Sequence, residues 1–500
     1  MDMKRHSIKE YVALLSDKGL IEETNLSRGE NERAVGHISF DSSDIRPDTL
    51  FVCKGAHFSV DYLSEALSKG AFVYVSETVH ATAPYIIVND VRKAMAYIAD
   101  MFYGRVSEDL KLVGITGTKG KSTTSYYLKY IFDDYLNSMG KPESAILSSI
   151  DNYDGVIDEE SHLTTPEAFV LHRHFKNAVE SGIEFLTMEV SSQGLKYNRT
   201  LGVVFDVGCF LNIDEDHISG IEHSDFEDYL SSKLLLFDQC KTVCVNLGSA
   251  HIERILGRAR ERAPKVITFG FHETAEVYGY DISVNQSGIS FKARTGSFDR
   301  EFELTMPGLF NVENALAAIA ACCALGIPEN HIFNGLKRAR ASGRMEVFRG
   351  GGIDVIVDYA HNKMSFEALF ASTLKEFPGK KIFIVFGCPG YKALGRRREL
   401  GEIAGKHAEM AFITEEDAGE EPVMDICLEI ARHIEKQGCR YEIIPDRGEA
   451  IERAIGLADG DTVILITGKG RETRQKRGLK YVETPSDVEY TEKFLAPHTL

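Results

Sequence analysis

Short apolar runs alternate with segments of helical periodicity along most of this chain. Near the start, apolar runs that end at Val52 and that occupy 71–76 and 85–88 predict buried strands. The segments 63–70 and 91–102 repeat apolar residues at helical spacing, and the first of them stops at a glycine. Because short strands that alternate with helices favour a mostly parallel sheet, this pattern predicts an α/β fold.

The same alternation returns twice, which indicates more than one domain. A second series has predicted strands at 112–115, 183–190 and 203–212, alternating strands over 281–304 and an alanine-rich helix over 315–325. A third series has predicted strands at 353–357, 381–387, 410–414 and 462–467. A chain of 500 residues is also too long for one ordinary core. We therefore expect three α/β domains, over 1–105, 106–342 and 343–500.

A glycine-rich loop follows the first strand of the second series. It reads Gly117-Thr118-Lys119-Gly120-Lys121-Ser122 and runs into a segment of helical character. Glycines let backbone N–H groups close around phosphate oxygens, the lysine adds a positive charge, and the serine hydroxyl can bind Mg²⁺. Ile115 stands where most loops of this kind have their first glycine, and a loop without a ligand is the alternative. Because Gly-Lys-Ser directly follows an apolar strand, the sequence predicts a nucleoside triphosphate site.

Acidic residues and a histidine follow two other predicted strands of this series. Glu189 ends the strand at 183–190, and Asp216 and His217 come after the strand at 203–212. Ligands of open α/β sheets collect beyond the carboxyl ends of the strands, so we expect Glu189, His217 and the loop to converge. Taken singly, Glu189 is equally compatible with a satisfied edge carboxylate, and His217 with a capping or core histidine. Together with the loop they suggest a Mg²⁺-polyphosphate centre, although histidine is a less usual Mg²⁺ ligand.

Composition and charge exclude some classes of binding partner and of cellular location. The formal net charge of −18 argues against a general affinity for nucleic acid or for anionic membranes, because both require a basic face. No apolar run approaches the roughly 20 residues that span a bilayer. The nine cysteines show no C-x-x-C spacing, and no signal peptide is evident. These features favour a reducing, cytoplasmic location.

Ten short motifs carry a resemblance to a known family. In chain order they are Asp41-Ser42, 114–122, Thr164-Thr165-Pro166-Glu167, Met188-Glu189-Val190-Ser191-Ser192, Asp216-His217, Ser232-Lys233-Leu234-Leu235, 311–314, Gly343-Arg344-Met345-Glu346, Asp358-Tyr359-Ala360-His361 and Gly468-Lys469-Gly470-Arg471-Glu472. Each is weak alone, but their order across the chain resembles the Mur ligases of bacterial peptidoglycan synthesis. Thr-Thr-Pro-Glu and Met-Glu-Val-Ser-Ser resemble the MurE branch, the UDP-N-acetylmuramoyl-tripeptide synthetases.

The resemblance implies an ATP- and Mg²⁺-dependent amide ligase with three domains. These would be an N-terminal domain that binds UDP, a central P-loop ATPase domain and a C-terminal Rossmann-like domain that supplies the amino acid. ATP would phosphorylate the D-glutamyl carboxylate of UDP-N-acetylmuramoyl-L-alanyl-D-glutamate, and the amine of L-lysine or meso-diaminopimelate would displace the phosphate. The expected partners are small molecules, and the expected state is a monomer.

The resemblance also assigns roles to individual residues. Lys121, Glu189, His217 and Lys233 would be catalytic; Ser122, Glu189, His217 and Lys233 would hold Mg²⁺, with Lys233 carbamylated. ATP would contact residues 117–122 together with Asn311, Asn314, Arg344, Asp358 and His361. The muramoyl substrate would contact Ser42, Thr164, Thr165, Ser191, Tyr197 and Arg199, and the amino acid Lys392, Glu416, Asp417, Gly468 and Glu472. The alternative for Lys233 is an exposed lysine on a helix.

Most departures from the family pattern are at residues that would contact the muramoyl substrate or the amino acid. Lys119 replaces a usual asparagine, and Gln193 a usual histidine. The diaminopimelate signature Asp-Asn-Pro-Arg is replaced by Glu416-Asp417-Ala418-Gly419, so no arginine fork is available there for a distal carboxylate. The acidic residues Glu415, Glu416 and Asp417 favour a cationic side chain such as that of L-lysine. The alternative is that the last arginine of the 396–398 run binds a distal carboxylate. Two alternatives stay open: a related ligase for another acid and amine, and a nucleotide-binding paralogue without catalysis.

Overall fold

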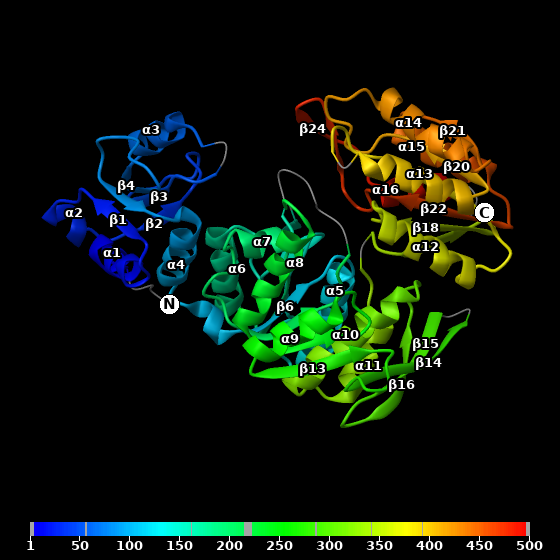
Figure 1. The fold of residues 1–500 in the computed structure, drawn as a ribbon, viewed down its shortest axis with the longest axis horizontal. Helices are drawn as coiled ribbons and strands as arrows, with labels where there is room; N and C mark the ends of the chain where they lie inside the picture. The colour runs from blue at the N-terminus through cyan, green and yellow to red at the C-terminus, as the bar shows by residue number, and fades with distance from the viewer. Residues whose placement is uncertain are drawn as a thin grey trace. The chain divides into compact units, whose positions relative to one another are not determined.

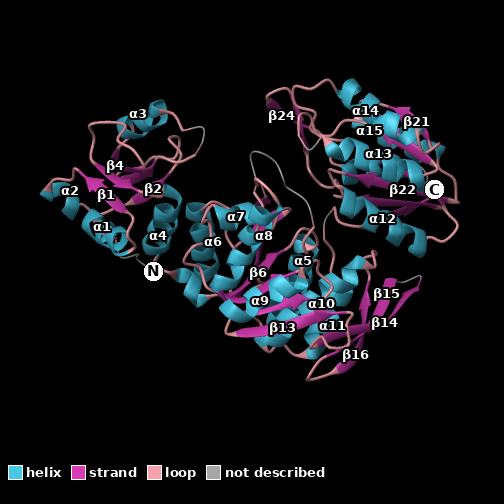
Figure 2. Cartoon of the chain, viewed as in Figure 1, coloured by secondary structure: helices cyan, strands magenta, loops and turns pink. Residues whose placement is uncertain are grey.

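The computed structural model describes residues 5–55, 58–161, 163–214, 223–285, 288–341, 343–392 and 394–496. The contacts of the chain divide it into two compact units. One unit contains Met1–Gly117, Phe132–Thr268 and Ala320–Pro328, and the other contains Thr118–Ile131, Phe269–Ile319 and Glu329–Leu500. Figures 1 and 2 show helices and strands alternating along the chain, as the sequence predicts.

The first part of the chain forms a five-stranded sheet. Its elements are α1 (Ile8–Asp17), β1 (Ile21–Thr24), α2 (Arg28–Glu32), β2 (His37–Ser39), β3 (Thr49–Val52), α3 (Val60–Ser68), β4 (Ala71–Ser76), β5 (Tyr85–Val88) and α4 (Val91–Tyr103). The strand order is β1-β5-β4-β3-β2, and only β1 runs antiparallel to its neighbour. The strands predicted to end at Val52 and to occupy 71–76 and 85–88 are therefore confirmed.

A second sheet follows, built around the strand that precedes the glycine-rich loop. Its elements are β6 (Lys111–Thr116), α5 (Lys121–Ser138), β7 (Ala145–Leu147), β8 (Asp151–Tyr153), β9 (Asp158–Glu160), α6 (Ala168–Glu180), β10 (Phe185–Glu189), α7 (Ser192–Lys196), β11 (Phe205–Phe210), α8 (Phe226–Leu234), β12 (Cys240–Asn246), α9 (Ile252–Arg262) and β13 (Lys265–Gly270). Strands β12, β11, β6 and β10 are neighbours in that order and run parallel. The short strands β7, β8 and β9 were not predicted.

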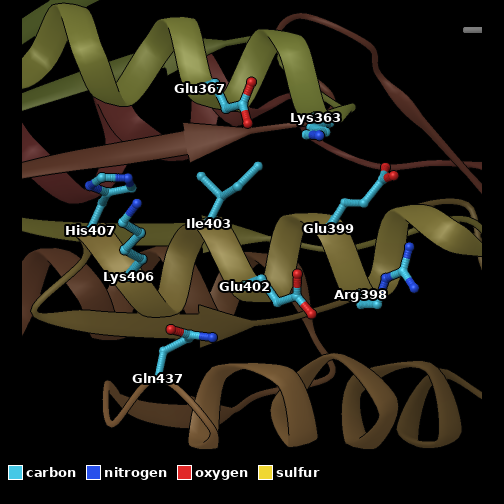
Figure 3. Close-up of a pocket in the computed structure, with 9 residues that line it drawn as sticks. All are labelled: Lys363, Glu367, Arg398, Glu399, Glu402, Ile403, Lys406, His407 and Gln437. Carbon is cyan, nitrogen blue, oxygen red and sulfur yellow. The ribbon is translucent and has the colours of Figure 1, made fainter. Parts of the chain in front are cut away.

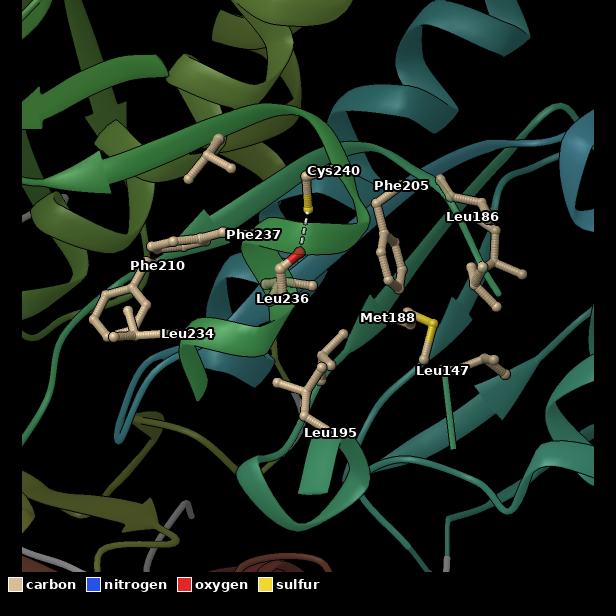
Figure 4. Close-up of a cluster of buried hydrophobic side chains, with 14 of the residues drawn as sticks. Leu147, Leu186, Met188, Leu195, Phe205, Phe210, Leu234, Leu236, Phe237 and Cys240 are labelled. Carbon is tan, nitrogen blue, oxygen red and sulfur yellow. Dashed lines mark hydrogen bonds between the residues drawn. The ribbon is translucent and has the colours of Figure 1, made fainter. Parts of the chain in front are cut away.

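The core of this sheet explains a glycine within β6. A Cβ atom at Gly114 would lie 2.9 Å from the ring of Phe205, so only glycine lets this ring pack against the strand. Phe205 lies in a buried cluster with Leu186, Met188 and Leu195 (Figure 4). The close packing fixes β6 between β10 and β11, and so fixes where the glycine-rich loop begins.

The remaining elements begin with a meander and continue into a six-stranded sheet. They are β14 (Val277–Asn285), β15 (Gly288–Arg294), β16 (Asp299–Leu304), α10 (Phe310–Leu325), α11 (Glu329–Arg338), β17 (Glu346–Gly350), β18 (Ile353–Asp358), α12 (Lys363–Glu376), β19 (Lys381–Phe386), α13 (Gly395–His407), β20 (Met410–Ile413), α14 (Val423–Glu435), β21 (Arg440–Ile443), α15 (Arg447–Leu457), β22 (Thr462–Thr467), β23 (Arg474–Arg477), β24 (Lys480–Glu483) and α16 (Asp487–Leu495). β14, β15 and β16 pair antiparallel, as the alternating pattern over 281–304 predicts.

The six-stranded sheet has the order β17-β18-β22-β19-β20-β21 and is parallel except for β17. Successive residues of β22 point to opposite faces: Val463 and Leu465 pack with residues of α12, α13 and α14, and Ile464 and Ile466 with residues of α15 and α16. Burial on both faces explains why its strands read as continuous apolar runs. The carboxyl ends of its parallel strands lie along one edge.

Candidate functional site

The loop after β6 opens into α5 at Lys121, as predicted. Gly120 has a φ of +86°, and a Cβ atom there would lie 2.1 Å from Asn314 Oδ1. The Asn314 amide donates to Asn311 Oδ1 at 3.0 Å, and the Asn311 amide donates to the Pro307 carbonyl at 2.6 Å. The two asparagines thus share one face of α10, as their spacing predicts, and that face packs against the loop.

Three other predicted nucleotide residues lie in the same unit as Gly120. Arg344 Nη2 lies 3.4 Å from Ser122 Oγ, and its guanidinium lies 4.4 Å from the centre of the Tyr359 ring. Asp358 ends β18 and accepts the N–H groups of Met345 at 2.9 Å and Ala360 at 2.8 Å. Burial raises the pKa of Asp358, while Arg344, these two N–H groups and Lys119 act in the opposite direction.

His361 belongs to the same surroundings. Its Nδ1 lies 2.8 Å from the carbonyl oxygen of Tyr359, and the rings of the two residues meet edge to face with centroids 5.2 Å apart. The structure thus brings together Lys119, Gly120, Ser122, Asn314, Arg344, Asp358 and His361 around one end of α5 and the start of the six-stranded sheet. Sequence reasoning predicted every residue of this group.

Lys233 lies near the start of the loop and is buried. Its side chain is 2% exposed, its Nζ donates to the Gly117 carbonyl at 2.9 Å, and it lies 4.6 Å from the centre of the Tyr229 ring. The alternative of an exposed helix lysine is therefore wrong. Burying a lysine ammonium costs free energy, so its burial here favours a role in the chemistry of the site over that of an ordinary surface lysine.

Glu189 ends β10 beside β6 and is 1% exposed. Ser149 holds its Oε1 through the backbone N–H at 2.8 Å and the hydroxyl at 3.1 Å. Among the described residues, no hydrogen bond to Oε2 is found, which leaves a hard oxygen of the kind that Mg²⁺ prefers. The described part of the chain holds no group of three or more histidine, cysteine, aspartate or glutamate side chains that could bind a metal; His217 lies outside it.

The residues predicted for the muramoyl substrate form a cluster next to Glu189. The Thr165 hydroxyl donates to the Glu189 carbonyl at 3.0 Å and accepts the Ser191 N–H at 2.9 Å. Arg199 donates to the Thr165 carbonyl at 2.9 Å, and partly buried Thr164 precedes Thr165 in the chain. Ser42 is held elsewhere: its hydroxyl donates to Glu65 Oε2 on α3 at 2.7 Å.

Two cations that sequence reasoning missed lie beside this cluster. Lys54 and Arg199 both bind the Glu167 carboxylate at 2.8 Å, and the Arg92 guanidinium lies 3.9 Å from the centre of the Tyr197 ring. Two cations therefore bind one carboxylate, Glu167, and a third stacks on the neighbouring Tyr197 ring. Lys54 and Arg92 are distant in the sequence from the residues of this cluster, and no local motif contains them. The sequence therefore did not predict their contacts.

The acidic residues predicted to contact the amino acid meet at the carboxyl edge of the six-stranded sheet. Glu416 is buried, and a Cβ atom at Gly468 would lie 2.3 Å from its Oε2. Asp417 and Glu472 are bridged by Lys469, which the sequence analysis includes in a motif but to which it assigns no role. Lys392 is exposed, and no contact between it and these acids is found among the described residues.

Comparison with known proteins assigns the chain to a family. The model of the Mur ligase middle domain matches residues 115–322, and that of the Mur ligase, glutamate ligase domain matches 343–470. The chain is 38% identical over 467 residues to UDP-N-acetylmuramoyl-L-alanyl-D-glutamate--L-lysine ligase of Streptococcus thermophilus, with 92% of each protein covered. The chain belongs to the Mur ligase family. The family resemblance and the prediction that this Mur ligase is an enzyme are thereby confirmed.

Other relatives agree with this assignment. This Mur ligase is 36% identical to UDP-N-acetylmuramoyl-L-alanyl-D-glutamate--L-lysine ligase of Enterococcus faecalis, with 90% of each protein covered. Its fold matches a solved structure of UDP-N-acetylmuramoyl-L-alanyl-D-glutamate--2,6-diaminopimelate ligase with a TM-score of 0.68, at 23% identity and over 99% of this chain and 100% of the other. This likeness confirms the predicted α/β fold.

A pocket of about 450 Å³ lies between α12 and α13 (Figure 3). Its lining residues are Lys363, Glu367, Arg398, Glu399, Glu402, Ile403, Lys406, His407 and Gln437. None of them is a predicted site residue, and charges of both signs line it, so we assign it no part in the activity of this Mur ligase.

Among the helices that the structure describes, none combines the length and apolar character needed to cross a membrane.

Proposed function

We propose that this Mur ligase uses ATP to join L-lysine to UDP-N-acetylmuramoyl-L-alanyl-D-glutamate. The observation that carries the proposal is the likeness over 92% of the chain to a ligase named for these substrates, together with the acidic cluster in place of an arginine fork. We also propose that the reaction takes place in the cytoplasm, that the enzyme is a monomer, and that its domains are residues 1–105, 106–342 and 343–500.

The proposed reaction has two steps. The D-glutamyl carboxylate attacks the γ-phosphorus of ATP, so that ADP leaves and an acyl phosphate forms. The α-amine of lysine, having lost a proton, then attacks the acyl carbon, the amide bond forms and inorganic phosphate leaves. Phosphoryl transfer needs charge neutralisation and positioning more than covalent help from the protein.

Loop and sheet residues would meet the nucleotide. The backbone N–H groups of residues 117–122 and the Lys121 ammonium would bind phosphate oxygens, and Asn314 keeps the loop in shape through its contact with Gly120. Arg344, Asp358 and His361 would contact the remainder of ATP. Mg²⁺ would neutralise phosphate charge when bound. Glu189, Ser122 and a carbamylated Lys233 are proposed to hold it, with His217, which lies outside the described residues, as a further predicted ligand.

The muramoyl peptide would bind beside Glu189. Thr165 and Ser191 present polar groups at the carboxyl end of β10, and Arg199 offers a cation to a substrate carboxylate. Thr164 and Tyr197 would complete this region, and Ser42 would contact the uridine end. Asp417 and Glu472 would receive the amino acid, because a carboxylate pair favours a substrate with a second ammonium.

The test is phosphate release from ATP in the presence of Mg²⁺, the muramoyl dipeptide and one amino acid at a time. Release that requires both the dipeptide and L-lysine supports the proposal. Release with meso-diaminopimelate in preference to lysine contradicts the choice of amino acid, and release with neither contradicts the function. Lys121→Met is expected to abolish release, whereas Lys129→Met, a matched change on the same helix, is expected to leave it within about twofold of wild type.

A further inference from the structure

The C-terminal end of α12 contacts the segment that opens α10. The Gly308 N–H donates to Glu376 Oε1 at 2.7 Å, and the Leu309 N–H donates to Ser372 Oγ at 3.2 Å. The two acceptors lie one turn apart on α12, and the two donors are consecutive in the chain. Backbone N–H groups at the start of a helix have no partner within that helix, so α12 supplies acceptors that α10 lacks.

An aromatic ring fixes the same segment. Phe310, the first residue of α10, packs against the buried cluster on one face of the six-stranded sheet, and this cluster contains Phe366 and Leu369 of α12. Gly308 has a φ of +97°, and a Cβ atom there would lie 2.8 Å from the Phe310 ring. The start of α10 is therefore held by two hydrogen bonds and one ring, in a backbone conformation that favours glycine.

The first turn of α10 connects this contact to the glycine-rich loop. The Asn311 amide donates to the Pro307 carbonyl at 2.6 Å, and Asn311 Oδ1 accepts the Asn314 amide at 3.0 Å. Asn314 Oδ1 is the atom nearest to the Cβ position of Gly120. Because this packing is close, a displacement of residues 307–311 would move Asn314 and, with it, the surface against which the loop packs.

The Glu376 carboxyl is unfavourable for stability at this position. Its side chain is half-buried, and burial raises its pKa to about 7, although the Gly308 and Leu309 N–H groups act in the opposite direction. The ionised form is therefore less favoured in the folded protein than in the unfolded chain, and an uncharged side chain would give a more stable fold. A residue that lowers stability while it makes specific contacts is typical of a functional position.

We propose that Glu376 and Ser372 are positioning residues that hold the start of α10 and thereby keep the glycine-rich loop in the shape that binds the phosphates of ATP. The inference rests on the proposed ATP site and adds two residues that lie 68 and 63 positions from the backbone groups they hold. The other end of α12 begins next to His361, whose N–H donates to Ser365 Oγ at 3.2 Å. Both ends of this helix therefore contact elements of the proposed nucleotide site.

The experiment compares wild type with Glu376→Met, Glu376→Gln and Glu367→Met. Glu376→Met removes the acceptor of the Gly308 N–H, whereas Glu376→Gln keeps an acceptor oxygen and removes only the charge. Glu367 is an exposed residue of the same helix, so its variant controls for the loss of a negative charge from α12. Hydrogen–deuterium exchange is measured without substrates on peptides that contain residues 308–314 and 118–124. Steady-state kinetics are measured with ATP, Mg²⁺, the muramoyl dipeptide and lysine.

The positioning role predicts a linked change in both peptides. In Glu376→Met, exchange is expected to be at least about fivefold faster over 308–314 and over 118–124, although the two segments are distant in the sequence. The KM for ATP is expected to rise about tenfold, while the KM values for the dipeptide and lysine stay within about twofold. Glu376→Gln is expected to recover most of both effects, and Glu367→Met to resemble wild type.

Other outcomes overturn the inference in distinguishable ways. Faster exchange confined to 308–314, with an unchanged KM for ATP, would show that the contact stabilises α10 without affecting the loop. Equal changes in all KM values would indicate general damage. If wild type ligates no amino acid, the proposed function fails, and binding of ATP with Mg²⁺ still decides the inference, because equal affinity in wild type and Glu376→Met would overturn it. If Glu376→Met does not fold, Ser372→Ala removes the acceptor of the Leu309 N–H, and the absence of any change in its exchange would overturn the inference.

Discussion

Gly120 allows the proposed role of the phosphate loop to be tested with one methyl group. Its φ of +86° lies in the left-handed region, where a Cβ atom costs about 1–2 kcal/mol. In Gly120→Ala the new carbon would lie 2.1 Å from Asn314 Oδ1 and must move by about 0.9 Å to reach the 3.0 Å that real contacts respect. Asn314 is 5% exposed and bonded to Asn311, so the loop backbone rather than the amide is expected to shift.

A shift of this size in a group that positions a reactant costs about 100-fold in rate, which corresponds to about 2.7 kcal/mol. We therefore expect Gly120→Ala to lower kcat/KM for ATP by about 100-fold. Gly140→Ala is the matched control, because Gly140 has a φ of +68° and no atom within 4 Å of its added carbon. Both variants are expected to lose about 1–2 kcal/mol of unfolding free energy, and only the first to lose activity.

The assay is ADP formation at saturating muramoyl dipeptide and lysine over a range of ATP concentrations, with urea unfolding of the same samples. A kcat/KM for Gly120→Ala close to that of wild type would refute the reasoning, because the contact with Asn314 would then have no bearing on the nucleotide. An equal loss of activity in Gly140→Ala would also refute it and would attribute the effect to general destabilisation.

Three further predictions concern buried titratable groups. Lys233→Ala is expected to abolish ligation, and a short carboxylic acid to restore part of it; unchanged ligation contradicts the carbamate. Burial lowers the pKa of His172 to about 4, and neither ring nitrogen finds a hydrogen-bond partner among the described residues. The folded state therefore favours the neutral form of His172, and the protein has its full stability above about pH 6.5. About 3 kcal/mol of unfolding free energy is lost as the pH falls to about 4. Urea unfolding of His172→Leu should show a flatter dependence on pH, and an unchanged one contradicts the assignment. Glu416→Gln should keep the KM for lysine within about twofold at pH 7, because burial raises the pKa of Glu416 to about 8; a large rise would show that the ionised form is needed.

The sequence predicted the elements whose signals are local. The strands β4, β5 and β22 are short apolar runs, and residues 117–122 of the glycine-rich loop are consecutive and form one motif. Strand β17 was missed because its residues are mostly half-buried and mix apolar with charged side chains. Strands β7, β8 and β9 are three residues each, too short for a periodic pattern.

The partners of site residues could not be predicted, because they come from distant parts of the chain. Ser149 holds Glu189 across 40 positions, and Lys469 meets Asp417 across 52. Lys54 reaches Glu167 from the first sheet, with no motif around it. Only the fold brings these residues together, so the sequence gives the types of side chain in the site but not the contacts that orient them.

The most direct test of the central claim is the mass of the product. The enzyme is incubated with ATP, Mg²⁺, UDP-N-acetylmuramoyl-L-alanyl-D-glutamate and an equal mixture of ¹⁵N-labelled L-lysine and unlabelled meso-diaminopimelate, and the nucleotide-linked product is analysed by mass spectrometry. We expect the mass of the dipeptide substrate to increase by one labelled lysyl residue, with one ADP formed for each product. Addition of diaminopimelate, or ADP formation with no gain in mass, would contradict the proposed lysine ligase.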